Sequence, residues 1–210
     1  MRDIGFKGGS ADPCLMTKQD ELGIVMLGIY VDDCLCIGNK AAIDKVIKDL
    51  QDKGLTLKVE REMKDYLSCE IIKAKDGKSA ILHQPHIIAS IEKQFGAMVK
   101  DLPTYKTSGT PGLGMIRNEE GPSISAEQQS LYRSGVGKLL YLVKHSRPDI
   151  ANAVRELSKV LDCASDASMK ELLRVVKYVL DTKNYGLKIA PVKSEQSGKL
   201  LSSLRPRLKK

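Results

Sequence analysis

The chain has 210 residues, of which 42% are apolar and 29% charged, so its composition is that of a folded globular protein, and no run of about 18 apolar residues predicts a membrane span. Its formal net charge is +8, but residues 191–210, with six basic side chains and one acid, carry +5 of it, so charge alone does not single out a nucleic-acid partner. The five cysteines form no Cys-x-x-Cys pair, which favours reduced thiols in the cytoplasm or nucleus over a secreted disulfide framework.

A hairpin followed by a helix is the first pattern along the chain. Residues 24–31 form an almost continuous apolar run and residues 35–37 a second one, so two buried strands are predicted with an Asp-Asp dipeptide between them. Asn39 offers a helix N-cap, and apolar residues then recur at helical spacing until Gly54 ends the pattern.

Three further strands are predicted in the next segment. Apolar residues alternate with polar ones over residues 55–59, and residues 66–72 and 79–84 are predicted to pair as a hairpin through the Asp-Gly dipeptide at 76–77. Pro85 can begin a second helix, whose apolar side chains lie on one face. The first part of the chain is therefore predicted to be α+β.

A connector and a helical bundle are predicted in the rest of the chain. Residues 99–125 hold four glycines and three prolines without any period, which is typical of a linker. Amphipathic patterns over residues 132–143, 150–161 and 169–180 predict three short helices with short links, and residues 185–190 predict one more strand.

The sharpest chemical feature is the motif Tyr30-Val31-Asp32-Asp33 at the expected hairpin tip. Two-residue hairpin turns favour Asn-Gly or Asp-Gly, so two aspartates without a glycine are a poor choice for an ordinary turn. Adjacent carboxylates also repel each other unless a cation lies between them, and a hard divalent ion such as Mg²⁺ removes that repulsion. A solvated acidic turn is the alternative, and it is the commoner explanation for an isolated Asp-Asp pair.

Two other groups of residues have competing explanations. Cys34 and Cys36 face the same side of a predicted strand, but zinc needs about four ligands, so core packing explains them better. Arg147 could contact a phosphate, or it could cap the preceding helix and hold Asp149 in place. The sequence supports these two roles of Arg147 equally.

An ordered series of short motifs runs through residues 4–190. The series is Gly5-Phe6, Asp12-Pro13-Cys14-Leu15, Tyr30-Val31-Asp32-Asp33, Lys64-Asp65-Tyr66-Leu67, Phe95-Gly96, Thr110-Pro111, Tyr132-Arg133-Ser134, Arg147-Pro148-Asp149-Ile150-Ala151 and Tyr178-Val179-Leu180. Because these motifs occur in this order and at this spacing, the chain resembles the reverse transcriptase of copia-type LTR retrotransposons.

The resemblance implies an α+β fold made of a partial polymerase palm, an antiparallel sheet with flanking helices, followed by a small thumb-like helical bundle. The partial palm is expected over residues 1–98, a linker over 99–125 and the helical thumb or connection region over 126–190. Residues 191–210 are expected to form a basic, disordered tail.

The same resemblance implies RNA-directed DNA polymerase activity. Asp32 and Asp33 would be catalytic carboxylates that hold two Mg²⁺ ions for template-directed nucleotidyl transfer. Tyr30 would lie beside the primer terminus, and Leu67 and Ser68 would belong to the hairpin that grips the primer.

Partners and location follow from the resemblance as well. Arg147 would contact nucleic acid, and the complete enzyme would use an RNA or DNA template, a DNA primer and dNTPs. The rest of the pol polyprotein is a possible partner, and the expected location is a virus-like particle in the cytoplasm, or the nucleus, with no membrane and no secretion.

Two departures from the family pattern bear on activity. The family takes a third metal-binding carboxylate from a motif well upstream of the Asp-Asp pair, and only 31 residues precede Asp32 here. Ser68 stands where the family usually has glycine. We therefore expect the chain alone to be inactive, and the alternative function is a non-catalytic retroelement remnant that at most binds nucleic acid or a partner chain.

Overall fold

The computed structural model describes residues 1–62, 64–75, 78–117 and 119–191. The chain divides into two compact units, Met1–Arg61 and Glu62–Lys210, which are described separately. Both units contain an antiparallel sheet and at least one helix, so the predicted α+β class is confirmed. The division lies earlier than the linker expected at 99–125, because the second sheet belongs with the helical part of the chain.

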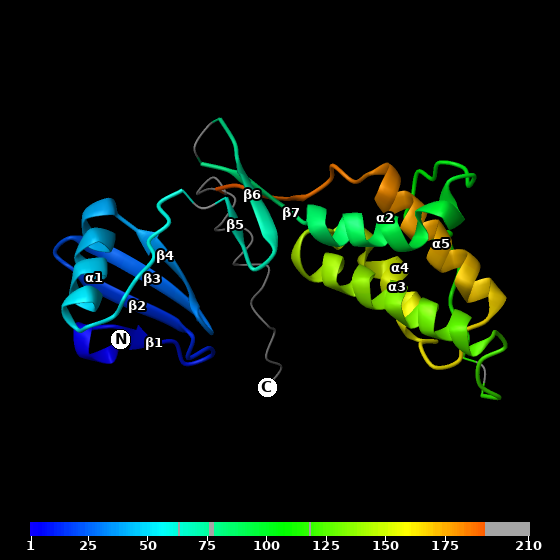
Figure 1. Cartoon of the computed structure of the whole chain (residues 1–210), viewed down its shortest axis with the longest axis horizontal. Coiled ribbons are helices and arrows are strands. Elements are labelled where there is room, and N and C mark those ends of the chain that lie inside the picture. The colour runs from blue at the N-terminus through cyan, green and yellow to red at the C-terminus, as the bar shows by residue number, and fades with distance from the viewer. Residues whose placement is uncertain (63, 76–77, 118, 192–210) are drawn as a thin grey trace, which may run out of the picture. The chain divides into compact units, whose positions relative to one another are not determined.

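The first unit is a four-stranded antiparallel meander covered by one helix (Figure 1). Its elements are η1 Arg2–Ile4, β1 Lys7–Gly8, β2 Leu15–Asp20, β3 Gly23–Tyr30, β4 Asp33–Gly38 and α1 Lys40–Asp52. The strands lie in the order β1-β2-β3-β4, which leaves β4 at an edge of the sheet.

Helix α1 covers one face of this sheet. Its buried residues Ala42, Val46 and Leu50 follow one another at four-residue spacing and so share one helix face. They pack against Val25 and Leu27 of β3, which point to the same side of the sheet. Gly54 ends the pattern with a φ of +86°, a conformation that favours glycine. The predicted helix is confirmed.

The second unit begins with another four-stranded antiparallel sheet. Its strands are β5 Asp65–Tyr66, β6 Cys69–Lys73, β7 Ala80–His83 and β8 Leu187–Ile189, in the order β5-β6-β7-β8. β8 pairs with β7 through Leu82 and Leu187, so the end of the described chain returns to the start of the unit. The unit is therefore closed by a long-range strand pair.

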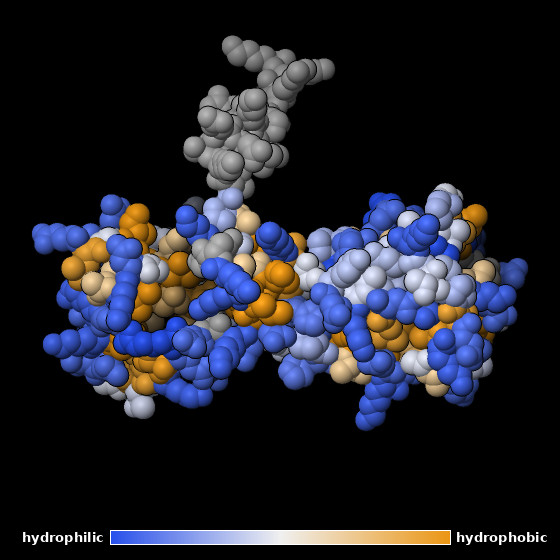
Figure 2. Space-filling view, turned by 90° about the horizontal axis from the view of Figure 1, so that it is seen from above, coloured by the Kyte–Doolittle hydropathy of each residue, from blue (hydrophilic) through white to orange (hydrophobic). Residues whose placement is uncertain are grey.

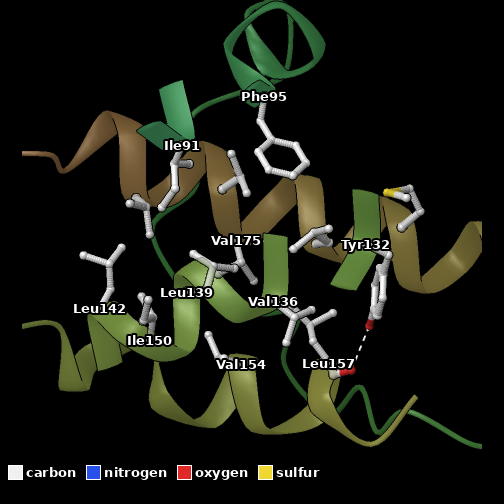
Figure 3. Packing of buried hydrophobic residues seen from close by; sticks show 14 of the residues in the cluster. Ile91, Phe95, Tyr132, Val136, Leu139, Leu142, Ile150, Val154, Leu157 and Val175 are labelled. Carbon is white, nitrogen blue, oxygen red and sulfur yellow. Dashed lines mark hydrogen bonds between the residues drawn. The ribbon is translucent and has the colours of Figure 1, made fainter. Parts of the chain in front are cut away.

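Helices form the rest of the second unit. They are α2 Pro85–Val99, α3 Ala126–His145, η2 Pro148–Ile150, α4 Ala151–Ser158 and α5 Asp166–Asp181. Capping boxes begin α3 at Ser125 and α5 at Ser165, which satisfies the first free N–H groups of both helices. Figure 3 shows their shared core, in which the ring of Phe95 points toward α5 and the Tyr132 hydroxyl donates to the Leu157 carbonyl at 2.8 Å.

The expected linker packs along the helices. The described residues of 100–125 contain no helix or strand, yet Leu102, Met115 and Ile124 pack against the helical core. The Met115 N–H also donates to Glu156 Oε2 at 3.2 Å. This segment is thus part of the second unit's surface.

Several predicted elements need correction. The strand at 55–59 is wrong, because these residues form no ladder; only Leu57 packs against the core. The single strand at 66–72 is interrupted at residues 67–68, which separate β5 from β6. β1 and β2 were not predicted, and the turn at 76–77 and the tail at 192–210 lie outside the described residues.

The surfaces of both units are mixed. Figure 2 shows apolar patches among hydrophilic ones on each unit, and the outer face of the first sheet exposes Ile24, Met26 and Ile37. Among the described residues, no helix combines the length and apolarity needed to cross a bilayer.

Candidate functional site

The Asp-Asp pair lies at the tip of a two-residue hairpin. Tyr30 of β3 pairs with Asp33 of β4 in the last step of the ladder, so Val31 and Asp32 form the turn. Val31 has a φ of +49°, and the residue is 82% exposed. A β-branched residue is disfavoured in this left-handed region, so the backbone of the tip is strained.

The hairpin beneath this tip is firmly held. β3 pairs with β2 on one side and with β4 on the other, and its residues Val25 and Leu27 are buried under α1. Asp32 and Asp33 are both exposed beyond this anchored base. Within the described part of the chain, neither carboxylate accepts a hydrogen bond or forms an ion pair. Both remain free to bind a cation from solution.

The other turn of the same sheet provides a contrast. Between β2 and β3 the two-residue turn is Glu21 and Leu22, and the following Gly23 takes the positive φ of +123°. There the Asp20 carboxylate is used locally, because Oδ1 accepts the Leu22 N–H at 2.9 Å and Oδ2 lies 3.8 Å from Lys18 Nζ. The carboxylate of Asp20 is thus bonded close to its own turn, whereas the carboxylates of Asp32 and Asp33 are not.

The two carboxylates alone fit a magnesium site only in part. Mg²⁺ prefers about six oxygen ligands, of which proteins supply one or two carboxylates and phosphates or water the rest. No group of three or more His, Cys, Asp or Glu residues among those described could hold a metal ion. Asp32 and Asp33 are therefore a partial ligand set.

The cysteines beside the tip face the helix side of the sheet. Cys36 lies opposite Leu27 in the ladder and packs against the core, as predicted, whereas Cys34 is exposed, so the predicted core packing is wrong for that residue. Burial raises the pKa of the Cys36 thiol, and the neighbouring Cys34 adds to that rise. Burial also raises the pKa of Cys34, with the negative charge of Asp33 as the second cause. Both thiols are therefore less easily ionised than an ordinary cysteine.

A second strained turn contains the other predicted primer contacts. Leu67 and Ser68 join β5 to β6 with φ values of +49° and +64°, although neither is a glycine. The Tyr141 hydroxyl of α3 donates to the Leu67 carbonyl at 3.4 Å, and the rings of Tyr141 and His145 lie 4.6 Å apart. These two aromatic residues were not predicted as contacts; their spacing of four residues places them on one face of α3, but His145 lies beyond the helix predicted over residues 132–143.

An open depression adjoins this turn. It has a volume of about 460 Å³ and is lined by charged and polar side chains, among them Lys64, Ser68, Glu70 and His86. Strained backbone tends to persist at functional sites because the surrounding structure enforces it. The turn at 67–68 is thus a second candidate contact surface, in the second unit, whereas Tyr30, Asp32 and Asp33 lie together in the first.

Arg147 lies inside the second unit, with only 1% of the residue exposed. Its guanidinium donates to both oxygens of Asp149, at 2.9 Å each. It also donates to the carbonyl of Thr182 at 3.1 Å and to the Thr182 hydroxyl at 2.8 Å. Because Thr182 is the C-cap of α5, the Arg147 side chain caps that helix, while the Arg147 backbone N–H donates to the Leu142 carbonyl at 2.9 Å and so caps the preceding helix α3, as predicted.

The surroundings of Arg147 complete its burial. The rings of Tyr178 and Tyr185 lie 5.7 and 5.5 Å from its guanidinium carbon, within cation–π range. Burial by itself would raise the pKa of Asp149, but the hydrogen bonds and charge of Arg147 outweigh it and hold that pKa below its usual value. Of the two predicted roles, the structure shows Arg147 holding Asp149, with the guanidinium occupied inside the fold.

Comparisons with known proteins complete the description. The chain is 27% identical over 184 residues to the Retrovirus-related Pol polyprotein from transposon RE1 of Arabidopsis thaliana, covering 88% of this chain and 12% of that protein. It is 29% identical over 178 residues to the Pol polyprotein from transposon TNT 1-94 of Nicotiana tabacum, covering 81% and 13%. The chain is similar to a region of retrotransposon Pol polyproteins.

A yeast relative agrees with these two. The chain is 24% identical over 188 residues to the putative transposon Ty5-1 protein of Saccharomyces cerevisiae, covering 90% of this chain and 59% of that one. The chain spans only 12–13% of the length of the two plant relatives named above. No family model and no solved structure matches it.

Proposed function

We propose that this chain is part of the reverse transcriptase of a copia-type retrotransposon, in which Asp32 and Asp33 are metal-binding carboxylates of RNA-directed DNA polymerisation. One observation carries the proposal: a strained hairpin tip presents two adjacent, unpaired carboxylates in a chain similar to retrotransposon Pol polyproteins.

The strain at Val31 argues against an ordinary solvated turn. A glycine or asparagine at this position would remove the left-handed strain, which for a residue with a Cβ is on the order of 1–2 kcal/mol. The β2–β3 turn of the same sheet has Gly23 at its positive φ and uses its carboxylate locally. The Asp-Asp tip has no glycine at its positive φ, and its carboxylates have no partner within the turn. Both carboxylates are therefore available to an external cation.

The position of β4 at the edge of the sheet would let an added strand supply the missing ligand of the metal site. Asp33 begins β4, and the far side of that strand has no partner strand among the described residues. An edge strand offers its free N–H and C=O groups to an added strand. We propose that another part of the polyprotein pairs there and brings the third carboxylate, so that Asp32 and Asp33 would hold Mg²⁺ together with it.

Ser68, Leu67 and Tyr30 fit roles beside nucleic acid in this proposal. Leu67 and Ser68 form one turn, and Tyr30, which is 58% exposed, is the last residue of β3 before the other. Arg147 is not proposed for such a contact, because its guanidinium is buried against Asp149 and Thr182.

A non-catalytic role is the second candidate. It is favoured by the lack of a third acidic ligand near the tip among the described residues. In that case the chain would bind nucleic acid through phosphate contacts, and its affinity would fall steeply with salt whether or not Asp32 and Asp33 are present.

A chimera separates the two functions. The segment of the tobacco polyprotein that directly precedes its matched region is joined to this chain, and primer extension on an RNA template is measured with Mg²⁺. We expect extension that Asp32→Asn abolishes and that Asp20→Asn, the matched change at the other acidic turn, leaves intact. Extension that is insensitive to Asp32→Asn would refute the assignment of the site. Salt-dependent duplex binding without extension would favour the non-catalytic role.

A further inference from the structure

Thr110 stands in an unusual sequence context. It is the only serine or threonine in the 210 residues that is followed directly by proline. It is exposed and lies within residues 100–125, whose described part forms no helix or strand. An exposed, irregular segment can adopt the extended conformation in which protein kinases bind their substrates, and Thr-Pro is the dipeptide that proline-directed kinases read.

Thr110 also makes a specific contact, which we call the Thr110–Glu171 clasp. Its backbone N–H donates to Glu171 Oε1 at 2.7 Å, and its hydroxyl donates to Glu171 Oε2 at 2.8 Å. The Glu171 side chain of α5 is only 11% exposed. One turn further along α5, the Arg174 guanidinium stacks 4.1 Å from the Tyr105 ring and donates to the Thr107 hydroxyl at 3.3 Å. The clasp therefore attaches the middle of the segment to α5.

We propose that Thr110 is a phosphorylation site for a proline-directed serine/threonine kinase, and that its phosphorylation opens the Thr110–Glu171 clasp. The kinase transfers the γ-phosphoryl group of ATP to Thr110 Oγ. A new O–P bond forms, the bond between the γ-phosphorus and the β,γ-bridging oxygen breaks, ADP leaves, and the hydroxyl proton passes to the kinase's base.

Electrostatic repulsion opposes the Thr110–Glu171 clasp once Thr110 carries a phosphate. The phosphate ester no longer has the hydroxyl hydrogen that Glu171 Oε2 accepts, and it adds a charge of about −1.5 to −2 beside the Glu171 carboxylate. Like charges at this distance repel in a partly buried site, and Arg174, whose Nε lies 4.0 Å from Glu171 Oε1, offsets only part of this repulsion because its guanidinium also contacts Tyr105 and Thr107. Gly112, two residues after Thr110, has a φ of +73° and open space around it, so the backbone there can turn away from α5.

The first test is chemical. The intact chain is incubated with a purified proline-directed kinase, ATP and Mg²⁺, and the phosphate is located by mass spectrometry. Thr110 is expected to be modified, whereas Thr104, which follows a proline instead of preceding one, is expected to stay unmodified. A synthetic peptide of residues 104–117 serves as the accessibility control. Phosphorylation of the peptide but not of the intact chain would overturn the proposal.

The second test measures the clasp itself. Hydrogen exchange of the Thr110 amide is followed in the intact chain before and after phosphorylation, and we expect exchange to become at least about tenfold faster. Thr110→Val removes only the hydroxyl and should have a smaller effect, and Thr104→Glu adds charge to the same segment away from Glu171 and should have none. Unchanged protection of the Thr110 amide in the phosphorylated chain would show that phosphate does not open the clasp.

Discussion

The buried Arg147 offers the sharpest test of how the second unit is held together. Arg147→Ala removes four hydrogen bonds to Asp149 and Thr182 and the contacts with two tyrosine rings. Removal of one partner of a fully buried ion pair costs about 3–5 kcal/mol, and because the Asp149 side chain is 37% exposed we expect a loss at the low end, about 3 kcal/mol. Since a domain is stable by roughly 5–15 kcal/mol, this loss brings the unit close to its limit.

Urea denaturation followed by far-UV circular dichroism measures this loss as a change in the free energy of unfolding. For a unit of this size, the melting temperature should also fall by roughly 6–12 °C. Arg147→Lys is the matched variant: it keeps the positive charge but cannot bond both Asp149 oxygens and Thr182 together, so we expect it to lose about 2 kcal/mol. A loss below about 1 kcal/mol for Arg147→Ala, together with weaker duplex binding, would refute the buried role and restore the phosphate contact.

Three further predictions concern single groups. Ser68→Gly should raise the free energy of unfolding by about 0.5–1 kcal/mol in urea denaturation, because glycine accepts the φ of +64° without strain; a loss would show that Ser68 is not left-handed. Tyr132→Phe should lower the free energy of unfolding by about 1 kcal/mol, because the Leu157 carbonyl loses the tyrosine hydroxyl as a donor but keeps the Val160 N–H. Tyr141→Phe, the matched change at an exposed tyrosine, should alter this free energy by less than about 0.5 kcal/mol. Because the pKa of Asp149 is lowered in the folded state, its contribution is present above the ordinary carboxyl pKa of about 3.9 and lost as pH falls through the folded value. The urea concentration at the unfolding midpoint should therefore decrease as the pH is lowered from about 6 to about 3. It should decrease less steeply in Asp149→Asn, and an equal dependence on pH in both proteins would contradict the pairing of Asp149 with Arg147.

Local signals were sufficient for much of the first unit. The apolar run before the Asp-Asp pair and the second run after it predict β3 and β4, and both strands form, but the turn lies one residue earlier, at Val31 and Asp32, and β4 is an edge strand without a buried residue. Periodicity also predicts α1, whose N-cap Asn39 has an extended conformation, although its side chain donates to the Leu22 carbonyl and does not cap the helix. Such elements depend on neighbours within a few residues, which is why sequence patterns capture them.

Long-range pairing accounts for most of what the sequence did not predict. Leu55 and Val59 alternate as strand residues do, but they have no partner edge and remain exposed. Neither Leu67 nor Ser68 is a glycine or an asparagine, the types that favour a positive φ, so their left-handed conformation comes from the ladder between β5 and β6. β8 was expected as a strand, but its pairing with β7 depends on how the helices between them pack.

In the candidate site, too, the features set by local sequence were predicted and those set by long-range packing were not. The Asp-Asp tip was predicted because turn chemistry is local, and its free carboxylates and strained Val31 agree with that prediction. The burial of Arg147 could not be decided from sequence. Its partner Asp149 is two residues away, but Thr182 is 35 residues away and comes close only through the packing of α5.

The central claim is that the tip at Asp32 and Asp33 binds divalent cations where an ordinary acidic turn does not. It is tested most directly by titrating the isotope-labelled chain with Mn²⁺ and following the broadening of backbone amide signals by NMR. The account predicts selective broadening around Asp32 and Asp33 that Mg²⁺ reverses and that the double change Asp32→Asn, Asp33→Asn abolishes. Equal broadening at the Asp20 and Glu21 turn, or none at either turn, would contradict it.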